Sequence, residues 1–128
     1  MKLLLDTHIL LWAAADSLPP AAAKYVLDES NELFFSPASI WEIVIKHGLN
    51  RADFSADPNL LNNALLENGY KQIPITAEHT LITGTLPQHH KDPFDRILLA
   101  QSISEGISLL TADEVLVKYP APVIYIQK

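Results

Sequence analysis

The sequence contains no cysteine, which excludes disulfide bonds and metal sites built from thiolates. It also lacks an apolar run of membrane-spanning length, and its N-terminus has neither the basic lead nor the small-residue cleavage site of a secretory signal. From these absences we expect a cytoplasmic protein without a membrane segment. Positive charge is scarce as well: 9 Lys and Arg residues stand against 15 Asp and Glu residues.

The resulting net charge of −6 argues against a nucleic-acid partner, because such binding usually draws on basic surface. The objection weakens if several of the acids surround a bound metal ion, since the cation then reverses the local field. The positions of the acidic residues therefore matter more than their number.

The 128 residues, 48% of them hydrophobic, suffice for one domain over residues 1–128 with a sizeable core. Short apolar runs alternate with amphipathic segments, without internal repeats or linker-like stretches. The apolar runs predict strands at residues 2–6, 33–36, 71–75, 107–111 and 122–127. The segments between them predict helices at residues 7–16, 22–30, 38–50, 59–69, 77–86, 94–106 and 112–119.

Helix boundaries are marked by capping residues, prolines and glycines. A capping side chain followed by proline at the first helical position predicts three helix starts, at Ser36-Pro37, Asp57-Pro58 and Asp92-Pro93. Ser17 is predicted to cap another helix, with Pro19 and Pro20 in its first turn. Glycines predict helix ends at Gly48, Gly69 and Gly106.

Continuous apolar strands that alternate with helices are typical of a parallel sheet covered on both faces. The fold class predicted is therefore α/β, a three-layer α/β/α sandwich around a central, mostly parallel sheet of four to five strands. Such sheets present their functional sites at the carboxyl ends of the strands. Asp6 ends the first predicted strand, and Asp113 lies just past another.

Four carboxylates can converge at this edge of the sheet. Asp6 and Asp113 follow strands, Glu42 lies in the helix of SIWEIVIKHG, and Asp95 lies in the first turn of the helix of PFDRILLAQ. Four such groups cannot all remain ionised unless a cation shares the space. Oxygen ligands without cysteine suit Mg²⁺ or Mn²⁺, which would support phosphodiester hydrolysis by a metal-activated water.

The stretches that carry these acids are DTHILLW, SIWEI, HHKDPFDRILLAQ and LLTAD. In this order and at these spacings, the chain resembles a PIN domain of the VapC toxin type along essentially its whole length. The resemblance implies a Mg²⁺- or Mn²⁺-dependent ribonuclease with an α/β/α sandwich, commonly dimeric and inhibited by a cognate VapB-like antitoxin. It carries the catalytic and metal-binding roles to Asp6, Glu42, Asp95 and Asp113, and the substrate is then RNA.

Each acid also has a structural interpretation. Asp6 and Asp113 can cap the helices that follow them, and Glu42 can form a surface ion pair with Lys46. Asp92, directly before Pro93, is predicted to be a cap, whereas Asp95 is assigned to the metal.

The roles of several neighbouring residues stay open at this stage. Arg96 could steady a carboxylate, contact a phosphate or be solvated. Thr111 is expected to support the site through its hydroxyl, Thr7 could do so or act as a cap, and His8 is left out of the site.

Two other functions compete with hydrolysis. One is a non-catalytic RNA-binding or regulatory module that acts through an antitoxin complex, which would need no metal. The other is a response-regulator-like domain with a nucleophilic aspartate, which is disfavoured because no lysine stands at a strand end where that chemistry needs it. The motifs carry no information about the RNA target or the preferred metal.

Overall fold

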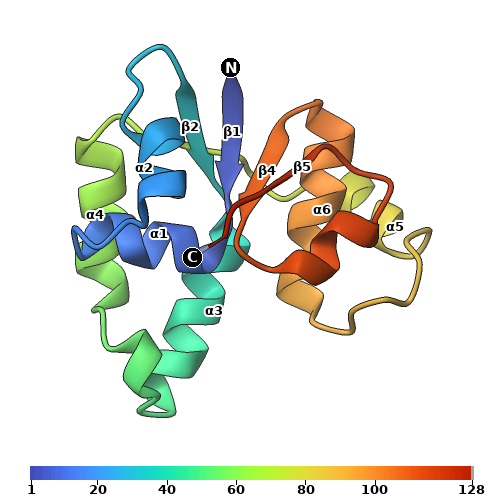
Figure 1. The fold of residues 1–128 in the computed structure, drawn as a ribbon. Coiled ribbons are helices and arrows are strands. Elements are labelled where there is room, and N and C mark those ends of the chain that lie inside the picture. The colour runs from blue at the N-terminus through green and yellow to red at the C-terminus, as the bar shows by residue number, and fades with distance from the viewer. Residues whose placement is uncertain (128) are drawn as a thin grey trace.

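The structure is a computed structural model that describes residues 1–127. Within them, five strands form one sheet in the order β3-β2-β1-β4-β5, and every neighbouring pair is parallel (Figure 1). The strands are β1 Lys2–Leu5, β2 Glu32–Phe35, β3 Lys71–Gln72, β4 Ser108–Thr111 and β5 Val123–Tyr125.

Helices cover both faces of this sheet (Figure 1). The α-helices are α1 Thr7–Ala14, α2 Pro20–Val26, α3 Pro37–Gly48, α4 Pro58–Glu67, α5 Ala77–Thr83 and α6 Pro93–Glu105, and the 3₁₀ helices are η1 Ala52–Phe54 and η2 Glu114–Lys118. Helices α1 to α4 pack on one face, and α5, α6 and η2 lie on the other. The predicted three-layer α/β/α sandwich is confirmed, with a sheet that is wholly parallel.

The leucines of β1 show how the sequence builds two cores from one strand. Leu3 and Leu5 are buried with α1 to α4, whereas Leu4 is buried on the opposite face with Leu98 and Leu99 of α6. Side chains alternate between the faces of a strand, so a run of three leucines serves both layers. Strand β1 is therefore a rigid central element, and its carboxyl end carries Asp6.

The predicted helix starts at proline are confirmed. The side chains of Ser36, Asp57 and Asp92 accept hydrogen bonds from backbone N–H groups in the first turns of α3, α4 and α6. The prediction for Ser17 was wrong, because α2 begins only at Pro20 and its N-cap is Pro19, which makes no side-chain cap bond. The Ser17 hydroxyl instead lies 3.4 Å from the carbonyl oxygen of Trp12.

Two of the three helix ends that were predicted at glycines are confirmed. Gly69 follows the C-cap residue of α4 and Gly106 is the C-cap of α6, with positive φ angles of 84° and 66° that glycine adopts without strain. Gly48 instead remains the last residue of α3, and the left-handed residue after that helix is Asn50, with φ of 56°. Asparagine tolerates this region better than most residues with side chains.

The edges of the sheet are shorter than predicted. Strand β3 has two residues of the predicted five, because Pro74 cannot donate to a strand ladder. The predicted helix at 112–119 is the 3₁₀ helix η2, and β5 keeps three residues of the predicted run. Among residues 1–127, no helix is long and apolar enough to cross a membrane.

Candidate active site

The carboxyl ends of the neighbouring strands β1 and β4 bring Asp6 and Asp113 to the same edge of the sheet. Leu5 pairs with Leu110, and the Asp6 backbone N–H donates to the Leu110 carbonyl at 3.1 Å. The Thr111 hydroxyl donates to the Asp6 carboxylate and accepts the Asp113 backbone N–H at 3.0 Å. Thr111 therefore links the two acids, and its expected supporting role is confirmed.

Asp6 is both a helix cap and a buried acid that faces the site. Its side chain is 6% exposed, and Oδ1 accepts the Ile9 N–H of α1 at 3.0 Å. Burial raises the pKa of Asp6, while the hydrogen bonds from Thr111 and Ile9 act in the opposite direction. The capping interpretation of Asp6 is therefore confirmed, and the capping carboxylate also lines the cavity with the other acids.

Glu42 does not lie on the surface of α3. It is 4% exposed, on a buried helix face that also contains Ser39. Thr7 donates to Oε1 at 2.6 Å, and Lys46 Nζ lies 2.5 Å from Oε2. The predicted pair with Lys46 exists, but its surface location was wrong, because the i,i+4 spacing gives the contact and leaves its burial undetermined.

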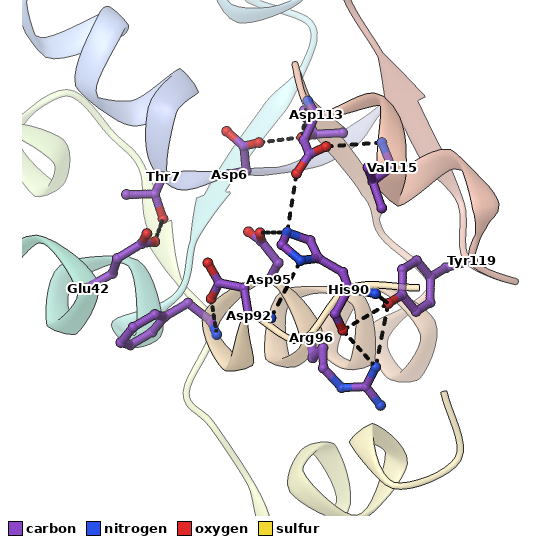
Figure 2. Close-up of polar contacts among 12 residues, drawn as sticks. Asp6, Thr7, Glu42, His90, Asp92, Asp95, Arg96, Asp113, Val115 and Tyr119 are labelled. Atoms are coloured by element: carbon purple, nitrogen blue, oxygen red, sulfur yellow. Dashed lines mark hydrogen bonds and ion pairs between the residues drawn. The ribbon is translucent and has the colours of Figure 1, made fainter. Parts of the chain in front are cut away.

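Two aspartates of α6 have different positions, as predicted. The Asp92 side chain accepts the Phe94 N–H at 2.9 Å and caps the helix. Asp95, three residues later, faces Asp113 and His90 (Figure 2). The pKa of Asp95 is raised to about 8, mainly because the side chain is buried and further because the other acids of the site lie near it.

Asp113 caps η2 by accepting the Val115 N–H through Oδ1 at 3.0 Å, which leaves Oδ2 facing the site. All four predicted acids line one cavity of about 190 Å³. The other residues that line it are Thr7, His8, Lys46, His90 and Asp92. Figure 2 shows acids from four separate elements around this space. The fold thus brings the predicted acids together, although Asp6 and Asp113 lie more than 100 positions apart in the sequence.

His90 is the residue that sequence reasoning missed. Its Nε2 lies 2.9 Å from Asp95 Oδ2 and 3.4 Å from Asp113 Oδ2 (Figure 2). The segment 87–93 reads as a polar loop, and the sequence signal was the pair of histidines directly before the Asp92-Pro93 helix start. Nothing in that signal distinguishes His90 from the exposed His89.

Arg96 has a role different from those left open. Its guanidinium lies close to the Tyr119 hydroxyl and donates to four backbone carbonyls of the segment before α6. These carbonyls accept at 2.7 to 3.3 Å and belong to Thr83, Leu86, Pro87 and His90. The Tyr119 hydroxyl in turn accepts the His90 N–H at 2.6 Å. Arg96 and Tyr119 therefore fix the backbone that presents His90 to the acids.

The donor set of the cavity fits a hard divalent cation. Asp6, Glu42, Asp95 and Asp113 offer carboxylate oxygens, with no sulfur ligand in the chain. Burial of the side chain, and after it the nearby acids, raise the pKa of Asp95, and a cation in the cavity would favour its charged form.

Comparisons with known proteins agree with the fold. The structure is similar to VapBC2 from Rickettsia felis bound to a promoter DNA fragment, with a TM-score of 0.73, 16% identity and 98% of each chain covered. A toxin–antitoxin complex from Klebsiella pneumoniae and VapBC-1 from nontypeable Haemophilus influenzae match with TM-scores of 0.67 and 0.66, each at 16% identity and 98% coverage of both chains. At such identities the likeness is one of fold. A search of curated proteins found no match.

The family comparison covers nearly the whole chain. The family model described as PIN domain matches residues 3–122, a span that includes Asp6, Glu42, Asp95 and Asp113. The resemblance found in the sequence motifs is thereby confirmed. This chain belongs to the PIN domain family.

Proposed function

We propose that the chain is a metal-dependent endoribonuclease and the toxin of a toxin–antitoxin pair. One observation carries the proposal: four acids from β1, α3, α6 and the end of β4 converge in one cavity of a PIN domain. The gathered charge fits a divalent cation better than it fits any acid–base pair of side chains, since burial and mutual repulsion oppose ionisation without one.

Asp6, Glu42, Asp95 and Asp113 would hold Mg²⁺ or Mn²⁺ through their carboxylate oxygens. A bound ion of this kind activates water for attack on a phosphodiester and offsets the negative charge that develops on the phosphate. Thr111 orients Asp6, and Thr7 orients Glu42, through the hydrogen bonds described above. Such supporting contacts keep the ligand oxygens directed toward the ion.

An RNA strand has room to approach the acids from one side. A groove of about 580 Å³ is shared with the site at Asp6 and Asp113 and extends past Trp12 and Tyr125. Aromatic side chains of this kind stack with unpaired bases. Lys46, which also contacts Glu42, supplies a positive charge at the cavity for a phosphate of the strand.

We infer that a cognate antitoxin and a second copy of the chain are its protein partners. The similar solved structures are described as toxin–antitoxin or VapBC complexes. The surface also offers an apolar groove of about 450 Å³, which includes Trp41 and Phe94, and the Trp41 side chain is 62% exposed. Apolar surface of this kind is typical of protein interfaces. We place the activity in the cytoplasm, where RNA is available.

The proposal is tested by cleavage of a structured RNA such as total tRNA. We expect cleavage with Mg²⁺ or Mn²⁺, no cleavage with EDTA, and loss of more than about 100-fold in Asp95→Asn, because a direct ligand should matter more than its supporting contacts. Asp57→Asn is the matched control, since asparagine retains the cap of α4 and Asp57 does not line the cavity. Binding of the RNA that persists in EDTA, without cleavage under any condition, would identify a non-catalytic RNA-binding module instead.

A further inference from the structure

His90 places a nitrogen between two of the acids that would hold the metal ion. Its Nε2 lies 2.9 Å from Asp95 Oδ2 and 3.4 Å from Asp113 Oδ2 (Figure 2). These two carboxylates come from the first turn of α6 and from the segment after β4. A cation held by both side chains would compete with Nε2–H for their oxygens, because carboxylate oxygens are the ligands that Mg²⁺ prefers.

The other ring nitrogen determines what Nε2 can do there. His90 Nδ1 lies 3.5 Å from the Asp92 backbone nitrogen, whose N–H can only donate. Nδ1 is therefore the acceptor, and Nε2 carries the ring N–H that faces the acids. A nitrogen that carries a proton donates a hydrogen bond and has no lone pair for a metal. In this orientation, His90 holds the two carboxylates and does not act as a ligand.

The backbone of His90 is fixed in a way that keeps the ring at this position. The Tyr119 hydroxyl accepts the His90 N–H at 2.6 Å, and Arg96 Nη1 donates to the His90 carbonyl at 3.2 Å. The ring itself is only partly buried, and its Nδ1 meets the Asp92 N–H at the longer distance of 3.5 Å. Rotation of the side chain can therefore withdraw Nε2 from the acids without moving the loop.

The geometry points to His90 as a positioning residue that competes with the metal ion for Asp95 and Asp113. It donates Nε2–H to the side-chain oxygens of both residues, holds the two side chains together, and must turn away before a cation can bind both. This inference rests on the proposed metal site. Its consequence is that His90 weakens metal affinity, which is the opposite of what a histidine ligand would do.

Binding of Mn²⁺ and of Mg²⁺ by isothermal titration calorimetry, after removal of metals with EDTA, tests the direction. We expect His90→Ala to bind either ion about threefold to tenfold more tightly than the wild type, because the ion no longer has to displace the hydrogen bonds of His90 Nε2–H. His90→Gln should stay near the wild type, since its amide can donate from a similar position. His89→Ala is the matched control, because His89 is exposed and contacts the Tyr119 ring but not the acids.

Weaker binding by His90→Ala, especially of Mn²⁺, would identify His90 as a ligand and overturn the inference, as would unchanged binding. A wild-type protein that binds neither ion would overturn the proposed function together with it.

A measurement on the wild type removes any dependence on how the variants fold. Nitrogen-15 NMR of the histidine rings, with the His90 signal assigned from its absence in His90→Gln, follows Nε2 as Mg²⁺ is added. Competition predicts that Nε2 keeps its proton and that its hydrogen bond to the carboxylates is lost. Loss of the Nε2 proton on metal binding would show direct ligation and contradict the inference.

Discussion

Asp6 and Asp95 line the same cavity but depend on different parts of the molecule. Asp6 ends a central strand, and its two carboxylate oxygens accept hydrogen bonds from the Ile9 N–H and the Thr111 hydroxyl. Asp95 lies in the first turn of α6, where its carboxylate contacts His90, a residue on the loop before that helix.

The difference shows two ways in which a fold can hold a buried acid. At Asp6, donors from α1 and β4 act against the effect of burial on the pKa. At Asp95, burial and the nearby acids together raise the pKa to about 8. Burial raises the pKa of both acids, but the fold gives Asp6 hydrogen-bond donors that favour its charged form, whereas the charge of Asp95 is left to a cation or to His90 to balance.

The hydrogen bonding around Asp6 is removed most directly by Thr111→Val, which keeps the shape of the side chain and removes the hydroxyl. Asp6 then loses a donor, and the Asp113 N–H loses its acceptor. We expect Mn²⁺ affinity, measured by calorimetry, to fall by about 10- to 100-fold, the usual effect of removing a contact that orients a ligand. Thr80→Val, on the exposed surface of α5, is the control. Equal affinities in Thr111→Val and the wild type would show that Asp6 needs no such support.

The effect of the charge on Asp95 is examined through the pH dependence of the stability of Asp95→Asn and the wild type. Between its ordinary value of 3.8 and about 8, Asp95 is protonated in the folded protein and ionised in the unfolded chain. The unfolded state then binds fewer protons, so wild-type stability falls as the pH rises through this window. Asparagine lacks this proton equilibrium and should therefore raise the melting temperature at pH 8 in EDTA by several degrees, roughly 3–8 °C. The gain should shrink as the pH falls toward 4.

Thermal unfolding followed by circular dichroism at a series of pH values gives this comparison. Asp57→Asn serves as control, because Asp57 caps α4 and is not among the residues that line the cavity. A variant that is no more stable than the wild type at pH 8 would mean that the charge on Asp95 is already balanced within the fold.

The sequence predicted the architecture because its signals were local and consistent. Continuous apolar strands such as Leu3–Leu5 predicted a parallel sheet, and the Ser-Pro and Asp-Pro pairs predicted three helix starts. The failures lay where local signals compete with context. Ser17 precedes two prolines and only the second begins the helix, and Gly48 could continue α3 because Asn50 adopts the left-handed conformation instead.

The site was predictable in its acids and less so in its other side chains. Parallel strands place their carboxyl ends at one edge, so Asp6 and Asp113 could be expected together from topology alone. The burial of Glu42 could not be anticipated from its apolar neighbours, because Trp41 and Val44 of the same stretch are exposed. The position of Lys46 in the cavity likewise depends on tertiary structure. His90 is held by Arg96 and Tyr119, whose contacts depend on tertiary structure and leave no periodic signal in the sequence.

The central claim is that four acids from different parts of the fold together bind a divalent metal ion in one cavity. Anomalous diffraction from crystals soaked with Mn²⁺ tests it most directly, because the manganese position is observed without reference to activity. We predict an anomalous peak inside the cavity, within coordination distance of oxygens from at least three of Asp6, Glu42, Asp95 and Asp113. A well-ordered cavity with no peak, or a peak bound only by acids elsewhere on the surface, would contradict the account.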